Sequence, residues 1–177
     1  MPPPHSAVVL VFDRLQAGFL GPYGGTWCDT PACNRLASEG YLAEQAWSDS
    51  DDLETIYRSF WSGRHAACRS APAAADEHAT PPPGLALAER LNSAGLYTEL
   101  VTDDPVVASH RWGDAFQERL MLPHDEAPGT AETAGSMRVA QLLAAAAERW
   151  DDLRSPSLLW IHASAWNDAW DAPFEFR

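Results

Sequence analysis

Short apolar runs alternate with stretches of helical periodicity along this chain. Residues 7–12 (AVVLVF) form an unbroken run rich in valine, which is typical of a strand buried on both faces of a parallel sheet. Residues 96–102 and 157–163 are expected to form two further strands. Shorter strands are expected over residues 41–47 and 115–122. The pattern therefore predicts strands spread along the whole chain.

Residues at helix ends mark the segments between these strands. Thr30 is expected to cap a helix that Gly40 ends, with proline at the first helical position. Asp51 or Asp52 is expected to cap the next helix, which Gly63 ends. Its apolar residues fall at helical spacing on one stripe: Leu53, Ile56, Tyr57, Phe60 and Trp61. Two more helices are expected over residues 84–94 and 130–150.

Strands that alternate with helices predict an α/β layered fold with a mainly parallel sheet. The 177 residues give room for one domain over residues 1–177. In such sheets, sites form beyond the carboxyl ends of the strands. Polar side chains follow three of the expected strands: Asp13 after the first, Asp103 and Asp104 after residue 102, and His162, Asn167 and Asp168 at the end of the last. We expect these groups to meet in one cleft.

The charged residues of the chain exclude several classes of function. The net charge is −13, and the 12 cationic side chains are all arginine. Without lysine the chain supports neither Schiff-base chemistry nor a P-loop. The acidic balance argues against a nucleic-acid partner and is compatible with a divalent cation or with simple solvation. The apolar runs are too short to span a membrane, and no secretion signal stands at the start, so we expect a cytoplasmic protein.

Five segments, in order, resemble the sulfatase family of the alkaline-phosphatase superfamily. They are VVLVFDRLQAGFLGPYG (8–24), TPACNRLASEG (30–40), SFWSGR (59–64), ERLNSAGLYTE (89–99) and LLWIHASAWNDAWDAP (158–173). The resemblance implies a three-layer α/β/α fold of the alkaline-phosphatase type. It also implies a hydrolase of sulfuric or phosphoric esters, a small anionic ester as ligand, and a divalent metal such as Ca²⁺ or Mg²⁺. Asp13 falls at the position of the family's metal-binding aspartate.

The chain departs from the family at the catalytic positions. An ungapped alignment from the Ser-Gly-Arg helix end places Leu53 at the nucleophile and Tyr57 at the motif's arginine. Leucine cannot be oxidised to formylglycine and has no lone pair for attack. Arg14 follows Asp13, where the family often has a second aspartate. The later metal-binding element of the family has no counterpart in the sequence. We therefore expect a catalytically impaired pseudo-enzyme, or the N-terminal part of a larger domain.

Two other functions stay open. The first is an active metal-dependent hydrolase with a relocated nucleophile, for which Thr55 is the candidate, and with a site completed by residues outside this chain. The second is a binding or assembly module that forms a homo-oligomer or pairs with a missing C-terminal half.

Several candidate side chains also have a purely structural interpretation. Arg58 and Arg64 suit an oxyanion, since guanidinium is a fork for sulfate or phosphate, or they are solvated arginines at a helix end. His162 lies within an expected strand, where a histidine is often a hydrogen-bonded core residue. Asp13 is either a metal ligand or a turn residue.

Overall fold

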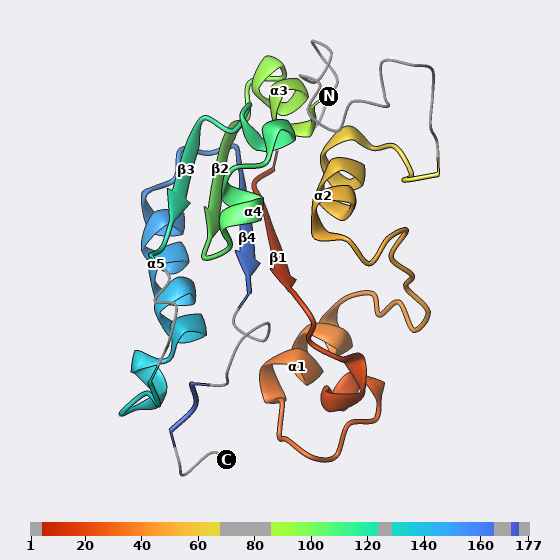
Figure 1. The fold of residues 1–177 in the computed structure, drawn as a ribbon, viewed down its shortest axis with the longest axis vertical. Helices are drawn as coiled ribbons and strands as arrows, with labels where there is room; N and C mark the ends of the chain where they lie inside the picture. The colour runs from red at the N-terminus through yellow and green to blue at the C-terminus, as the bar shows by residue number, and fades with distance from the viewer. Residues whose placement is uncertain (1–4, 68–85, 124–128, 165–170, 174–177) are drawn as a thin grey trace. The chain divides into compact units, whose positions relative to one another are not determined.

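The computed structural model describes residues 5–67, 86–123, 129–164 and 171–173. Its centre is a four-stranded sheet in the order β1-β4-β2-β3 (Figure 1). The strands are β1 (Ala7–Phe12), β2 (Tyr97–Thr102), β3 (Glu118–Met121) and β4 (Ser157–Ala163). All three strand pairs are parallel. The predicted α/β class with a mainly parallel sheet is therefore confirmed.

Helices cover both faces of this sheet, because strand side chains alternate between the faces. Leu100, Leu158 and Trp160 join a cluster with α2 (Leu53–Ser62) and α3 (Leu87–Ser93). Val101, Leu159 and Ile161 join a second cluster with α5 (Arg138–Asp152) on the opposite face. These two cores give the three layers that the resemblance implies.

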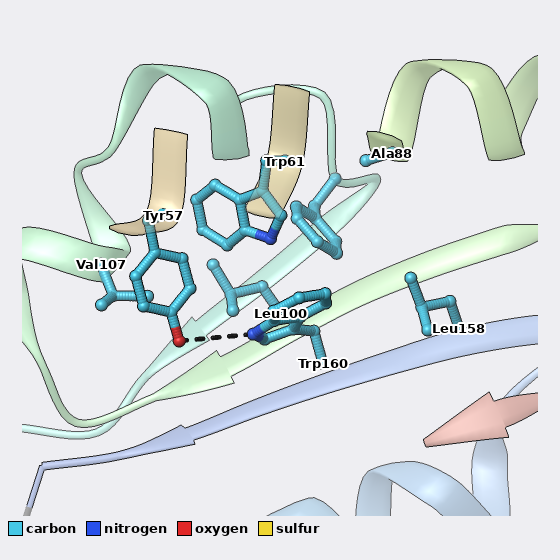
Figure 2. Packing of buried hydrophobic residues seen from close by; sticks show 8 residues of the cluster. Tyr57, Trp61, Ala88, Leu100, Val107, Leu158 and Trp160 are labelled. Carbon is cyan, nitrogen blue, oxygen red and sulfur yellow. Dashed lines mark hydrogen bonds between the residues drawn. The ribbon is translucent and has the colours of Figure 1, made fainter. Parts of the chain in front are cut away.

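The first cluster is unusually aromatic (Figure 2). Tyr57 and Trp61 are almost fully buried on α2 and meet edge to face, with ring centroids 4.6 Å apart. Trp61 also lies edge-on to Trp160 of β4 and to Phe116. A Cβ added at Gly113 would lie 2.7 Å from the Trp61 ring, so only glycine fits there without a shift. The aromatic stripe of α2 is thus the main contact between this helix and the sheet.

The ends of α2 follow the sequence signals. Asp52 is the N-cap, and its side chain accepts a hydrogen bond from Thr55 N at 2.8 Å. Gly63 closes the helix at a φ of 67°, in the left-handed region that glycine adopts without a steric penalty. Both predictions for this helix are confirmed.

Residues 14–48 form a compact unit distinct from residues 1–13 and 49–177. The smaller unit contains η1 (Ala17–Phe19), η2 (Gly21–Tyr23) and α1 (Pro31–Glu39). The bounds of α1 agree with the prediction, and Thr30 is its N-cap residue, although the Thr30 side chain makes no capping hydrogen bond. Thr30 Oγ1 instead accepts a hydrogen bond from Gly21 N at 2.9 Å, which ties the loop to the start of the helix.

Three expectations were wrong. Residues 41–47 form no strand. The last helix begins at Arg138 rather than near residue 130, because η5 (Ala134–Ser136) interrupts the stretch with its own capping box at Thr133. β1 is not covered on both faces, since Val8 is 49% exposed and Leu10 43%.

Five short described elements were not anticipated: η1, η2, η5, α4 (Pro105–Ala108) and η4 (Arg111–Gly113). None of the described helices is both long and apolar enough to cross a membrane.

Candidate functional site at the carboxyl ends of the strands

The strand register brings the predicted polar groups to one edge of the sheet. Phe12 lies opposite Ala163, and Thr102 lies opposite His162. The backbone of Asp13 continues the pairing, with its N–H donating to Ala163 O at 3.0 Å. The residues that follow β1, β2 and β4 therefore lie next to one another, as the parallel arrangement predicts.

Asp103 joins the ends of β2 and β4. Its Oδ1 accepts a hydrogen bond from Ser164 N at 2.7 Å, and its Oδ2 lies 3.9 Å from Arg138 Nη2 at the start of α5. Asp171 supports the same helix end, because its side chain accepts from Arg138 N at 2.8 Å. The Asp103 side chain is 5% exposed. These contacts assign Asp103 a structural task that sequence reasoning did not foresee.

Asp104 caps the short helix α4. Its Oδ1 accepts hydrogen bonds from Val106 N at 2.8 Å and from Val107 N at 3.1 Å. Its own N–H donates to Thr102 Oγ1 at 3.0 Å. Capping therefore uses one carboxylate oxygen of Asp104, and the charge of the group remains beside the strand ends.

His162 is fully buried in β4 and bonded to the aromatic cluster. Tyr57 Oη lies 2.6 Å from His162 Nδ1, and Trp160 Nε1 donates to Tyr57 Oη at 3.4 Å. Among the described contacts, the Tyr57 hydroxyl proton has its acceptor in His162 Nδ1, so the neutral imidazole carries its proton on Nε2. The buried Nε2 has no hydrogen-bond partner among the described residues. His162 is thus a hydrogen-bonded core residue through Nδ1, as its structural interpretation predicts, but not through Nε2.

The charges of three carboxylates influence the pKa of His162. Burial lowers the pKa of His162 below its ordinary value, and the charges of Asp104, Asp13 and Asp103 oppose that shift. Burial also raises the pKa of Tyr57, and the charges of Asp104 and Asp13 add to the rise. Tyr57 therefore stays a hydroxyl donor at neutral pH, and the strand ends carry a negative potential.

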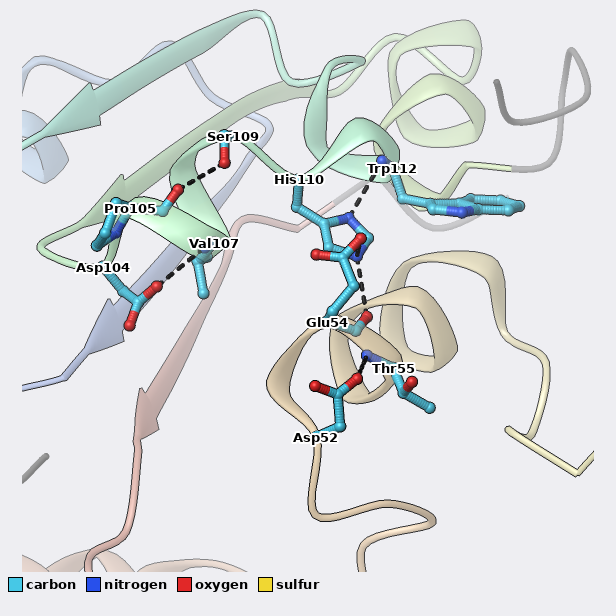
Figure 3. A network of polar contacts seen from close by, with 9 residues as sticks. All are labelled: Asp52, Glu54, Thr55, Asp104, Pro105, Val107, Ser109, His110 and Trp112. Carbon is cyan, nitrogen blue, oxygen red and sulfur yellow. Dashed lines mark hydrogen bonds and ion pairs between the residues drawn. The ribbon is translucent and has the colours of Figure 1, made fainter. Parts of the chain in front are cut away.

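The start of α2 carries a second acidic group (Figure 3). Hydrogen bonds from the side chain and backbone of Thr55 lower the pKa of Asp52, and Arg58 adds to the effect. Leu53 is the first residue of α2 and packs against the aromatic cluster. Glu54 adds another acid in the first helical turn. The structure thus places Thr55 and Arg58 around Asp52.

His110 fastens η4 to this part of α2, a role that no sequence pattern indicated. Its Nδ1 accepts a hydrogen bond from Trp112 N at 3.2 Å, which leaves Nε2–H to donate to Glu54 O at 3.0 Å (Figure 3). The side chain of His110 is 1% exposed. Sequence reasoning had no means of finding this contact, because Glu54 and His110 are 56 residues apart.

One described candidate, Arg64, lies away from the start of α2. Arg64 follows Gly63, beyond the end of α2 opposite to Asp52, and is exposed. Asn167 and Asp168 lie outside the described residues.

A charged cluster stands at the amino-terminal side of β2 and β3. Arg149 of α5 pairs with Glu99 of β2 and with Glu118 of β3. Glu99 is buried, with a side chain 2% exposed, so Arg149 compensates a charge inside the fold. A cavity of about 330 Å³ adjoins this cluster and is lined by these three residues together with Tyr97 and neighbouring residues at the end of α5. Its lining is dominated by groups that already pair with one another.

The described residues do not supply a complete set of ligands for a cation. Nowhere in the described ranges do three histidine, cysteine or carboxylate side chains gather closely enough to hold a metal ion. Asp103 and Asp104 each use one carboxylate oxygen in structural hydrogen bonds, and Asp13 is the metal-ligand candidate from the sequence. A divalent cation such as Ca²⁺ or Mg²⁺ would need ligands from beyond this set.

Two solved structures share this fold. They are crystal structures of the C-terminal periplasmic domain of EcEptC from Escherichia coli, one of them in complex with Zn. The Zn complex matches with a TM-score of 0.64 at 14% identity, over 93% of this chain and 44% of that chain. The other matches with a TM-score of 0.53 at 14% identity, over 93% and 43%. No protein-family model and no curated protein matches the sequence.

These matches define the class of fold. The chain has an α/β fold of the alkaline-phosphatase-like type, as the sequence resemblance implied. It spans less than half the length of the solved chains that it matches. The likeness shows the fold alone, and the sulfatase assignment stays a prediction from the motifs.

Proposed function

We propose that this chain is a sulfatase-like protein of the sulfuric and phosphoric ester hydrolase class whose ester-cleaving step is impaired. The observation that carries the proposal is Leu53, the first residue of α2, at the position that the motif alignment gives to the nucleophile. Leu53 packs against the aromatic cluster and lies next to the capping residue Asp52. A hydrocarbon side chain in this place offers no atom that attacks sulfur or phosphorus.

Charge at the start of α2 supports the same proposal. A helix N-terminus attracts anions because its first N–H groups are unpaired. Here Thr55 N already donates to Asp52, and Glu54 adds a second carboxylate in the first turn. An anionic sulfate or phosphate ester would have to approach two carboxylates at this position. The arrangement therefore disfavours the charge that accumulates during ester cleavage.

The number of ligands that a catalytic metal needs also supports an impaired ester-cleaving step. Metal-assisted ester hydrolysis needs a cation that activates the attacking group and stabilises the leaving oxygen. Asp13 is one ligand candidate, and hard cations take six or more oxygen ligands. The role that suits the negatively charged strand ends is weak cation binding, with Asp13 as the ligand candidate.

An active hydrolase with Thr55 as nucleophile is the second candidate, and one observation favours it. The Thr55 side chain hydrogen-bonds to the Asp52 carboxylate, which is the pairing of a hydroxyl nucleophile with a base. The same hydrogen bonds lower the pKa of Asp52, which weakens it as a proton acceptor. The pair is also an ordinary N-cap, so we rank this candidate second.

Covalent trapping separates the two candidates. The chain is incubated with an aryl phosphate ester and a panel of Ca²⁺, Mg²⁺, Mn²⁺ and Zn²⁺, quenched in acid, and its intact mass is measured. The proposal predicts no added phosphoryl group. A phosphoryl adduct on Thr55 that is lost in Thr55→Val and retained in Ser59→Ala would establish the second candidate instead.

A further inference from the structure

A cavity lies at the end of the sheet opposite to the carboxyl ends of the strands. Its volume is about 330 Å³, which is within the range of small-molecule pockets. α5 runs against the direction of the strands, so its C-terminal end reaches the first residues of β2 and β3 (Figure 1). The described lining contains none of the strand-end residues Asp13, Asp103 and His162. The cavity is therefore separate from the candidate site at the strand ends.

Paired charges form one wall of this cavity. Arg149 bridges Glu99 of β2 and Glu118 of β3, and the Glu99 side chain is 2% exposed. Apolar side chains often stabilise a fold as well as a buried ion pair does, so stability alone does not explain this pairing. Burial and a hydrogen bond to Glu118 raise the pKa of Tyr97 to about 12, so its hydroxyl stays protonated at neutral pH. These contacts fix the position and the polarity of the wall.

Two charged side chains of the lining stand outside this pairing. Asp152 is the last residue of α5, and Arg154 lies two positions beyond it. Both side chains are exposed, and neither has a hydrogen bond or an ion pair with another described residue. Leu153 between them packs against the second core cluster, so the backbone that carries them is anchored beside the cavity. Asp152 and Arg154 thus offer one negative and one positive group to a ligand.

The end of α5 adds a preference for a cation beside Asp152. The last carbonyl groups of a helix have no partner within it and carry partial negative charge. Leu153 continues in an extended conformation, and its N–H donates to Trp150 O at 3.3 Å. No described residue donates a hydrogen bond to the carbonyl groups of residues 151 and 152. An ammonium group has three donors, which suit a carboxylate together with such carbonyl oxygens.

We propose that this cavity binds a free α-amino acid as a zwitterion. Its ammonium group lies against Asp152 and the carbonyl end of α5. Its carboxylate pairs with the Arg154 guanidinium, which matches a carboxylate through two parallel hydrogen bonds. An α-amino acid carries both charges on one carbon atom, which suits two side chains that flank a single residue. Its binding does not depend on whether the strand-end site cleaves esters.

A zwitterion fits these observations better than a ligand with one charge. A simple cation would leave Arg154 without a partner, and a simple anion would leave Asp152 without one. An anion would also approach a chain of net charge −13, whereas a zwitterion has no net charge that this field opposes.

The test measures binding to the chain by isothermal titration calorimetry. The probes are the common L-amino acids, one at a time, and the tightest should bind with a Kd at or below ~1 mM. Two analogues of that amino acid are then compared with it: its α-hydroxy acid, which lacks the ammonium group, and its α-carboxamide, which lacks the carboxylate. Each analogue should bind at least ~10-fold more weakly, because it loses one charge-assisted contact.

Three variants assign the two contacts. Asp152→Asn should weaken binding of the amino acid at least ~10-fold and abolish its advantage over the α-hydroxy acid. Arg154→Gln should weaken binding similarly and abolish the advantage over the α-carboxamide. Asp151→Asn is the matched control, because Asp151 is also an exposed acid at the end of α5 and does not line the cavity. The melting temperature should be almost unchanged in all three, since the replaced side chains are exposed.

Three results would overturn the proposal. The first is a native chain that binds none of the amino acids at ~10 mM. The second is binding of either analogue as tight as that of the amino acid. The third is equal binding by Asp152→Asn and Asp151→Asn, or native binding by Arg154→Gln.

Discussion

Tyr57 on α2 and His162 on β4 are joined by a hydrogen bond of 2.6 Å between the phenol oxygen and Nδ1, although they are 105 residues apart. The contact sits where the aromatic core meets the polar ends of the strands. In the motif alignment, which stays a prediction, Tyr57 falls where the sulfatase family has an arginine. The hydrogen bond fixes the imidazole tautomer and binds the helix to the sheet.

Tyr57→Phe should therefore destabilise the fold. It removes the acceptor of Trp160 Nε1 and the donor to His162 Nδ1, and leaves two buried polar atoms without partners. We expect a loss of about 1–3 kcal/mol in the free energy of unfolding, measured by urea denaturation. Tyr41→Phe is the control, since Tyr41 is 93% exposed and should lose almost nothing. Equal effects of the two substitutions would contradict the assignment.

The free energy of unfolding should decrease as the pH is lowered, because of His162. Burial lowers its pKa in the folded state below the ordinary 6.5, so below that pH the unfolded chain binds a proton that the folded chain does not. The contribution is complete above about pH 6.5 and is lost as the pH falls towards the lowered pKa. The slope is at most about 1.4 kcal/mol per pH unit.

The measurement is urea unfolding between about pH 5 and pH 7.5 for the native chain, His162→Gln and His5→Gln. His162→Gln should flatten the profile in this window. His5 is exposed, so His5→Gln should keep the native slope. A slope that survives in His162→Gln would assign the pH dependence to another group.

Gly113→Ala should strain the aromatic core. The added methyl group would lie 2.7 Å from the ring of Trp61, which is fully buried and cannot move aside freely. We expect a destabilisation of about 1–3 kcal/mol by thermal or urea unfolding. Gly18→Ala is the matched control, because a Cβ there meets nothing within 4 Å. If Gly113→Ala unfolds like Gly18→Ala, the packing of η4 on Trp61 is looser than described.

Arg149→Met should destabilise the chain by leaving Glu99 buried without its partner. Breaking a fully buried pair costs about 3–5 kcal/mol. We expect about 1–3 kcal/mol here, because the Arg149 side chain is 38% exposed and water screens the charge. Arg35→Met removes a surface pair with Glu39, where both side chains are more than 60% exposed, and should cost less than about 0.5 kcal/mol. Comparable losses in the two variants would show that Glu99 is not held by Arg149.

Local signals predicted much of this fold because they are carried by neighbouring residues. The bounds of β1, α1 and α2 follow from one apolar run, one Thr-Pro pair and the Asp52 and Gly63 ends of a helix. The same local reasoning missed the break before α5, because the Thr133 capping box competes with a continuous helix. It also could not tell an edge strand from a central one, since burial of β1 depends on what lies beside it.

The sequence predicted that polar groups follow neighbouring strand ends, but it did not predict their contacts. The carboxyl ends of parallel strands place Asp13, Asp103 and His162 together by topology alone. Which group each one meets depends on partners far along the chain: Ser164 for Asp103 and Tyr57 for His162. The alignment predicted a tyrosine at the motif's arginine position, but it did not predict the hydrogen bond of Tyr57.

The measurement that tests the central claim most directly is the rate of aryl sulfate and aryl phosphate cleavage by the native chain and by Asp13→Ala. Both proteins are purified identically and assayed with Ca²⁺, Mg²⁺, Mn²⁺ and Zn²⁺ in turn, so that any contaminating hydrolase contributes equally. The impaired site predicts the same background rate in both, because Leu53 supplies no nucleophile. Metal-dependent cleavage by the native chain that disappears in Asp13→Ala would contradict the proposal.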